Sequence, residues 1–188
     1  IGQLVNLSSM AADAGITHNT AKEWISLLEA CYIVFLLRPH HRNFSKRLIK
    51  SQKLYFHDTG LASWLLSIET ERAMNLSSMR GPLFENLIIS EMLKTRYNAG
   101  RRSNLHFWRD RAGHEVDLIV DRGDVLIPVE MKSGQTVAAD SFKGLDWWKK
   151  LASEDDSFLV YGGDRSYDRA GTSVFSWRDN AALRSIQA

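Results

Sequence analysis

The stretch GHEVDLIVDRGDVLIPVEMKS, residues 113–133, decides the fold that this sequence predicts. It contains two runs rich in apolar and β-branched residues, residues 114–120 and 125–131. Between them lies the polar segment Asp121-Arg122-Gly123-Asp124, whose composition is typical of a tight turn. Two such runs around a glycine-containing turn predict a β-hairpin.

The hairpin also predicts which side chains share a face. A loop of two or four residues places Asp117 opposite Pro128, and side chains alternate between the two faces of each strand. Asp117 is then expected on the same face as Glu130 and Lys132. The other face is apolar and is formed by Val116, Leu118, Val129 and Met131.

Two carboxylates and one ammonium on a single face suit metal-assisted phosphodiester chemistry. Asp117 and Glu130 offer the oxygen ligands that Mg²⁺ or Mn²⁺ prefers, and a bound metal lowers the pKa of its water. Lys132 points the same way and can orient that water or neutralise the phosphate. The alternative is a solvated strand face with an Asp–Lys cross-strand pair. Against it, charges in a strand that is otherwise apolar are costly unless they are paired or bind an ion.

The order of the charged residues carries a resemblance to a known superfamily. Glu85 in a helix, then Asp117, then Glu130-Met131-Lys132 resembles the pattern of PD-(D/E)xK nucleases. More narrowly, GPLFEN at 81–86, GHEVD at 113–117 and VEMKS at 129–133 resemble the DUF4143 domain at the C-terminus of many prokaryotic AAA-type ATPases.

This resemblance implies a fold and a site. The implied fold class is α/β, with a winged-helix-like segment followed by a nuclease-like αβββαβ core and a mixed sheet. The implied metal ligands are Glu85, Asp117 and Glu130, and the implied catalytic residues are Asp117, Glu130 and Lys132. Independently of the resemblance, Glu85 is also explained as a carboxylate near a helix N-terminus, where the helix dipole favours negative charge.

Composition describes an ordinary globular chain. Of its 188 residues 24% are charged and 44% hydrophobic, and the net charge is +2. No apolar run approaches the roughly 18 residues of a membrane span. The start at Ile1 has no initiator Met and no signal-peptide pattern, so we interpret the chain as a fragment of a cytoplasmic protein. The single cysteine, Cys31, has apolar neighbours and is expected to be a buried thiol.

The first part of the chain, residues 1–68, predicts a winged-helix-like domain. Helices are expected at 4–14 and at about 17–30, separated by Gly15, and strands at 32–38 and 53–56. Trp24 is expected in the core. The predicted DNA contacts are the basic residues Lys22, Arg42, Lys46, Arg47 and Lys50. The alternative is that this domain packs on a neighbouring one and its basic loop is simply solvated.

The second part follows a polar linker predicted at residues 69–80. From residue 81 the pattern predicts a helix to about 97, a strand at 105–109, the hairpin, a helix at 139–152, and strands at 157–161 and 172–177. This order is the αβββαβ core that the resemblance also implies. The domain is predicted to span residues 81–188.

Three functions are therefore open. The first is a DNA-associated, Mg²⁺-dependent nuclease-like domain at the C-terminus of an AAA-type ATPase. The second is a catalytically silent module that binds DNA or protein and regulates that ATPase. The third is a homodimerisation domain. The chain contains no G-x-x-x-x-G-K-[ST] segment, so ATP is expected only in an upstream module of the same polypeptide.

Overall fold

The structure is a computed structural model that describes residues 1–40 and 49–187. It begins with helices α1, Leu7–Ala14, and α2, His18–Ala30, followed by strands β1, Val34–Leu37, and β2, Lys53–Phe56. Gly15 ends α1 in the left-handed conformation, with φ 67°, and the Thr17 hydroxyl caps α2 by accepting from Thr20 N. The predicted two helices and antiparallel strand pair are confirmed. The interpretation of this segment as a winged helix stays a prediction.

Three helices connect this part to the rest of the chain. They are α3, Thr59–Leu65; α4, Glu71–Leu76; and α5, Arg80–Asn98. Asp58 caps α3 through hydrogen bonds from Gly60 N and Leu61 N. The segment expected to be a polar linker thus includes α4, which begins after a side-chain cap from Thr70.

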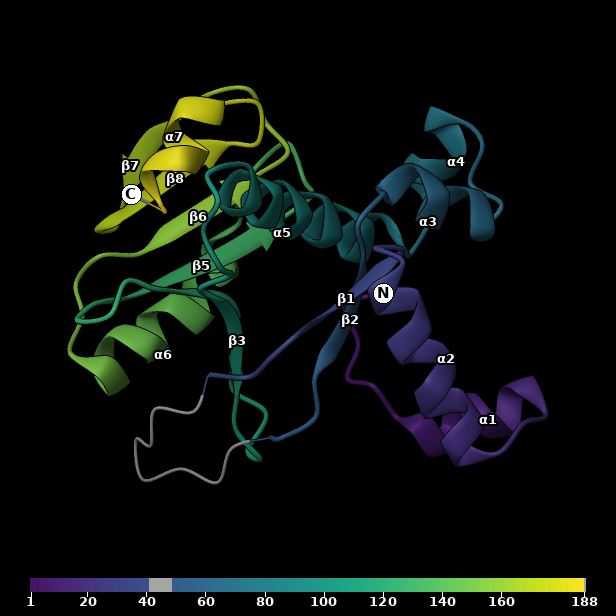
Figure 1. The fold of residues 1–188 in the computed structure, drawn as a ribbon. Coiled ribbons are helices and arrows are strands. Elements are labelled where there is room, and N and C mark those ends of the chain that lie inside the picture. The colour runs from purple at the N-terminus through teal and green to yellow at the C-terminus, as the bar shows by residue number, and fades with distance from the viewer. Residues whose placement is uncertain (41–48, 188) are drawn as a thin grey trace.

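The remaining chain forms the predicted mixed sheet (Figure 1). Its strand order is β3-β4-β5-β6-β8-β7, antiparallel from β3 to β5 and parallel from β5 through β6 to β8. Helix α5 packs on one face and α6 on the other, so the α/β fold class is confirmed. The elements are β3, Leu105–Arg109; β4, Glu115–Asp121; β5, Leu126–Lys132; the 3₁₀ turn Ala139–Phe142; α6, Lys143–Ala152; β6, Phe158–Tyr161; β7, Tyr167–Arg169; β8, Thr172–Ser176; and α7, Asn180–Ser185.

The register of the central hairpin corrects the prediction. Ile119, not Asp117, lies opposite Pro128, so the pairing is shifted by two residues. The β4–β5 ladder stops at Leu118 and Val129, and β4 has a bulge where it pairs with β3. An extra residue reverses the alternation of side chains. As a result Val116 packs in the core cluster of α6, whereas Leu118 packs in that of α5, and the two do not share a face as expected.

The two parts of the chain share one hydrophobic core. Phe35 and Tyr55 of the first part belong to the same buried cluster as Ile88 and Ile89 of α5. The chain after β1 also runs beside β3, where Phe107 N donates to Arg38 O at 3.1 Å. The strands β1 and β2 are therefore fixed against α5 and the edge of the sheet.

Two predictions about single residues in the first part are wrong. Trp24 is 54% exposed on α2 instead of lying in the core, and the Cys31 thiol is exposed instead of buried. Both lie on or just after α2, whose buried residues are only Ala21 and Ile25. The apolar stripe of this helix is thus covered only in part by its own chain.

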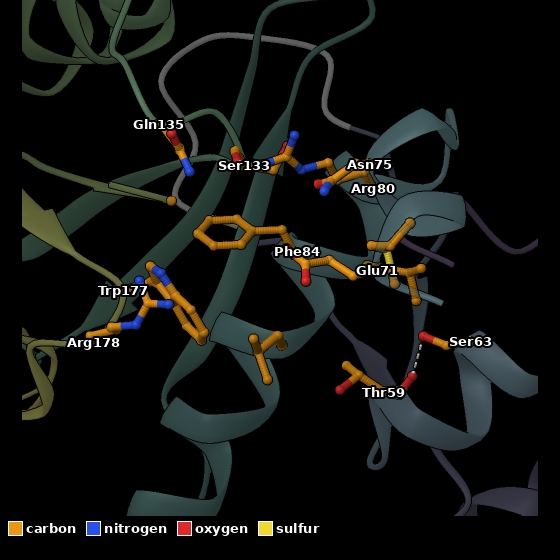
Figure 2. Close-up of a pocket in the computed structure, with 14 residues that line it drawn as sticks. Thr59, Ser63, Glu71, Asn75, Arg80, Phe84, Ser133, Gln135, Trp177 and Arg178 are labelled. Carbon is orange, nitrogen blue, oxygen red and sulfur yellow. Dashed lines mark hydrogen bonds between the residues drawn. The ribbon is translucent and has the colours of Figure 1, made fainter. Parts of the chain in front are cut away.

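A cavity of about 330 Å³ lies where α3, α4 and the start of α5 meet the ends of three strands (Figure 2). Ser133, Gly162 and Trp177, which directly follow β5, β6 and β8, line it. These are the carboxyl ends of the parallel strands, where open α/β sheets commonly bind ligands.

Candidate functional site

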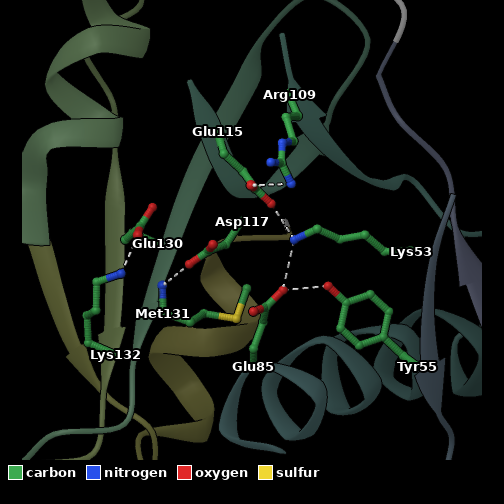
Figure 3. Close-up of polar contacts among 9 residues, drawn as sticks. All are labelled: Lys53, Tyr55, Glu85, Arg109, Glu115, Asp117, Glu130, Met131 and Lys132. Atoms are coloured by element: carbon green, nitrogen blue, oxygen red, sulfur yellow. Dashed lines mark hydrogen bonds and ion pairs between the residues drawn. The ribbon is translucent and has the colours of Figure 1, made fainter. Parts of the chain in front are cut away.

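The acidic centre lies where the β4–β5 ladder ends (Figure 3). Asp117 projects into the gap between the two strands, and its Oδ2 accepts a hydrogen bond from Met131 N at 2.9 Å. Glu130 is buried on β5, and its Oε1 pairs with Lys132 Nζ at 2.5 Å. The structure thus brings together the three residues that the sequence predicted as catalytic.

Glu85 reaches this centre from the second turn of α5. Its Oε1 accepts a hydrogen bond from the Tyr55 hydroxyl at 2.5 Å and pairs with Lys53 Nζ at 3.2 Å. Both donors come from β2, in the first part of the chain. The predicted metal ligand Glu85 therefore lies near Asp117, but its nearest donors are two side chains of another segment.

The sequence did not predict that Lys53 belongs to the acidic centre. Lys53 is only 3% exposed, and its ammonium lies between Glu85 and Glu115, with 2.6 Å to Glu115 Oε1 (Figure 3). The other Glu115 oxygen pairs with Arg109 Nη1 at 3.3 Å across the β3–β4 pair. Glu115 is therefore a partner for two cations.

The sequence of β2 gave no direct signal for Lys53. Its residues alternate between polar and apolar, and an alternating strand normally buries its apolar face. Here Lys53 and Tyr55 are buried, whereas Leu54 and Phe56 are half-buried. Burying a lysine and a tyrosine hydroxyl requires partners, so this face requires a polar centre opposite to it.

Asn86, the residue after Glu85, holds the same strand by its backbone. Its Oδ1 accepts from Phe56 N at 2.8 Å, and its Nδ2 donates to Phe56 O at 2.7 Å. Asn86 is fully buried, and without its side chain the backbone N–H and C=O of Phe56 would both lose these hydrogen bonds. The dipeptide Glu85-Asn86 therefore clamps β2 onto α5 through side-chain and backbone contacts together.

The electrostatics of the centre follow from burial and from the closeness of its carboxylates. Burial and the Asp117 carboxylate raise the pKa of Glu130 to about 8, against the opposing effect of Lys132. Burial and Asp117 likewise raise the pKa of Glu85. Burial alone would lower the pKa of Lys53, but the carboxylates of Glu85 and Glu115 outweigh it and raise the pKa. Lys53 is therefore an ammonium at any physiological pH.

The arrangement does not fit the expected Mg²⁺ or Mn²⁺. Such a cation needs several carboxylate oxygens directed at one point, together with water. In the part of the chain that the structure describes, no group of three or more His, Cys, Asp or Glu side chains is arranged to hold a metal ion. Glu85, Asp117 and Glu130 each bind an internal donor, and the Lys53 ammonium lies among the carboxylates as their cation.

Two of the five predicted DNA contacts lie within the described residues. Lys22 on α2 and Lys50 before β2 are exposed, as a phosphate contact requires. Arg42, Lys46 and Arg47 lie outside the described residues. DNA binding by these five residues stays a prediction.

Within residues 1–40 and 49–187, no helix combines the length and the apolar character that a membrane crossing needs.

Two family models match this chain, one for each of its parts. Residues 80–179 match the family model described as "Domain of unknown function (DUF4143)", and residues 1–72 match "Domain of unknown function (DUF8612)". Two uncharacterized proteins, from Mycobacterium bovis and Mycobacterium tuberculosis, are each 28% identical over 120 residues. The match covers 64% of this chain and 26% of each relative, so the chain spans about a quarter of the length of the curated relatives it matches. No solved structure shows significant similarity to it.

Proposed function

The chain belongs to the DUF4143 family of domains of unknown function, and we propose that it is a catalytically silent, nuclease-like interaction module of a longer polypeptide. The observation that carries this proposal is the position of Lys53. Its ammonium lies between Glu85 and Glu115, where a nuclease would need its metal ion. The acidic centre then serves to join the first part of the chain to the sheet.

The free energies involved favour the Lys53 ammonium over a metal ion as the cation of the centre. Breaking a buried ion pair by removing one partner costs about 3–5 kcal/mol, because the other charge is left unpaired. A divalent ion present at a concentration equal to its Kd stabilises the folded state by only about 0.4 kcal/mol. A metal that had to displace Lys53 would therefore gain almost nothing, and the lysine keeps its place.

The first part of the chain offers the interaction surface. Large apolar side chains are exposed on and beside two helices: Trp24, Leu27 and Tyr32 at α2, and Trp64 and Leu65 on α3. The Tyr32 ring contacts His57, which lies just before α3, with 5.7 Å between ring centroids. Contiguous patches of such side chains are typical of protein interfaces. We assign this surface to the rest of the longer polypeptide, for which the resemblance implies an AAA-type ATPase.

One observation favours a second function, Mg²⁺-dependent phosphodiester cleavage. Asp117, Glu130 and Lys132 meet at the end of the β4–β5 ladder, in the chain order that PD-(D/E)xK nucleases use. This function requires Lys53 to leave Glu85 and Glu115 so that a metal can enter. The two functions therefore predict opposite results in a metal titration.

The test is calorimetric titration of Mg²⁺ and of Mn²⁺ into the protein, together with a plasmid-nicking assay on the same sample. We expect no saturable heat at millimolar metal and no nicking above a metal-free control. Saturable binding together with nicking that is lost in Asp117→Asn would overturn the silent module and establish the nuclease. Arg111→Gln is the matched control, because Arg111 is exposed in the turn before β4.

A further inference from the structure

The cavity at the carboxyl ends of β5, β6 and β8 is a second centre, separate from the acidic one (Figure 2). Its walls come from both parts of the chain, with α3 and α4 on one side and the strand ends on the other. At about 330 Å³ it is within the size range of small-molecule sites. Its lining differs from that of the acidic centre, because it combines arginines with aromatic rings.

The floor of the cavity is held rigidly by backbone contacts. Gly162 N donates to Lys132 O at 3.0 Å and to Gly134 O at 3.1 Å. A Cβ at position 162 would lie 2.5 Å from Ser133 O, so only glycine allows the two strand-end loops to pack this closely. Arg80 Nη2 also donates to Ser133 O, at 2.9 Å. The site is therefore formed before any ligand arrives.

The charges of the cavity favour an anion. Arg80, the first residue of α5, donates to a neutral carbonyl group, and within residues 1–40 and 49–187 its guanidinium forms no ion pair. The N-terminus of a 19-residue helix adds a partial positive charge at the same place. A second arginine, Arg178, lines the cavity on the strand side but is paired with Asp164 at 2.5 Å, while Glu71 lies on the side of α4. An anionic group is thus favoured near Arg80 and disfavoured near Glu71.

The aromatic rings favour a planar group beside that anion. Phe84 and Trp177 both line the cavity, with 6.4 Å between ring centroids and an angle of 70°. The Arg178 guanidinium lies 4.5 Å from the Trp177 ring centre and fixes that ring. Two polar side chains also line the cavity: Asn75 on the side of α4 and Gln135 on the side of the strand ends. Each can donate and accept hydrogen bonds. Rings with polar groups nearby suit a nucleobase.

We propose that this cavity binds a 5′-phosphorylated nucleotide, with its phosphate at Arg80 and its base against Phe84 and Trp177. The same chemistry is presented by a free nucleoside monophosphate and by the 5′ end of a nucleic-acid strand. The site uses none of the acidic residues, so it is independent of whether the chain cleaves phosphodiesters. A ligand there would touch both parts of the chain and would tighten their contact.

The experiment is calorimetric titration, in EDTA, of deoxyadenosine 5′-monophosphate, of deoxyadenosine and of inorganic phosphate. We expect saturable binding of the nucleotide and at least tenfold weaker binding of its two halves, because each half loses one set of contacts. A 5′-phosphorylated trideoxynucleotide distinguishes the sources: binding at least as tight as the mononucleotide indicates a strand end, and weaker binding indicates a free nucleotide.

Variants then locate the site. Arg80→Gln and Phe84→Leu should each weaken nucleotide binding about tenfold, since one stacking contact or charge-assisted hydrogen bond is worth that factor. Phe84→Leu keeps apolar bulk and guards against a folding defect in Arg80→Gln. Arg101→Gln, in the exposed loop after α5, is the matched control and should bind like wild type. No saturable nucleotide binding at millimolar concentration, phosphate binding as tight as the nucleotide, or equal weakening in Arg101→Gln would each overturn the proposal.

Discussion

The acidic centre and the nucleotide cavity use adjacent residues of the same two chain segments, yet their chemical characters are opposite. On α5, Glu85 belongs to the centre and Phe84 to the cavity, and at the end of β5 the same holds for Lys132 and Ser133. In the centre, each charged group has an internal partner. In the cavity, arginine and aromatic side chains surround open space. The chain thus fills the acidic centre with its own lysine, whereas the adjacent cavity stays open.

The two regions differ because the first part of the chain contributes different side chains to each of them. Strand β2 places Lys53 and Tyr55 against Glu85, and their burial requires those polar contacts. Helices α3 and α4 deliver mostly small and polar groups to the wall of the cavity, such as Thr59 and Ser63, and these do not fill it.

The largest effect is expected from Lys53→Met. The substitution keeps the bulk of the side chain but leaves the Glu85 carboxylate without its cation and the Glu115 carboxylate with Arg109 alone. We expect the free energy of unfolding to fall by about 3–5 kcal/mol, measured by urea denaturation. We also expect Mn²⁺ to raise the melting temperature of this variant and not that of wild type, because the place of the cation is then open.

Lys94→Met is the matched control, since Lys94 pairs with Glu91 at 2.7 Å on the exposed face of α5. An exposed pair of this kind contributes less than about 1 kcal/mol. Equal destabilisation by the two substitutions would contradict the role given to Lys53 and would remove the contrast between the two regions.

A smaller effect is expected from pH. The pKa of Glu130 is about 8 in the folded protein and 4.5 ordinarily, so between these values the folded state holds a proton that the unfolded state has lost. The free energy of unfolding therefore falls as pH rises through this window, by at most about 1.4 kcal/mol per pH unit for this group. The stabilisation is complete below pH 4.5 and is lost as pH passes 8.

The measurement is the difference in urea-unfolding free energy between wild type and Glu130→Gln from pH 6.5 to 8. Below pH 6.5, His57 acts in the opposite direction, because burial lowers its pKa. We expect the glutamine variant to have the flatter profile. Parallel profiles would mean that Glu130 is ionised throughout and that Lys132 alone compensates its charge.

The smallest effect on stability is expected at the cavity. Gln135 is exposed on its wall, so Gln135→Ala should change the free energy of unfolding by no more than about 0.5 kcal/mol. Nucleotide affinity should fall about two- to tenfold if the amide donates or accepts one neutral hydrogen bond. A large loss of stability would show that this wall is structural, as the acidic centre is.

The sequence predicted the elements of the fold well and their pairing less well. Gly15 and Thr17 mark the boundary between α1 and α2, and Pro82 lies in the first turn of α5, because caps and turn residues act locally. The bulge in β4 was not predictable in this way. It depends on how Trp108 and Val116 pack against α6, which the residues around Asp117 do not encode by themselves.

The candidate site shows the same limit. The sequence predicted Asp117, Glu130 and Lys132 near one another, and neither the register error of two residues nor the bulge beside Asp117 separated them. Lys53 is 64 residues away from Asp117 in the sequence and reaches it only because β2 packs on α5. A salt bridge between distant segments leaves no periodic signal on either one.

By itself, then, the sequence determined the mixed α/β class, the hairpin and the gathering of two carboxylates with a lysine, because these depend on local propensity and on alternation within neighbouring strands. Only the tertiary structure decided that Lys53 is the cation of the acidic centre and that a cavity opens beside it. Both depend on which surfaces of the two parts come into contact. Contact between distant segments is decided by the packing of the whole chain.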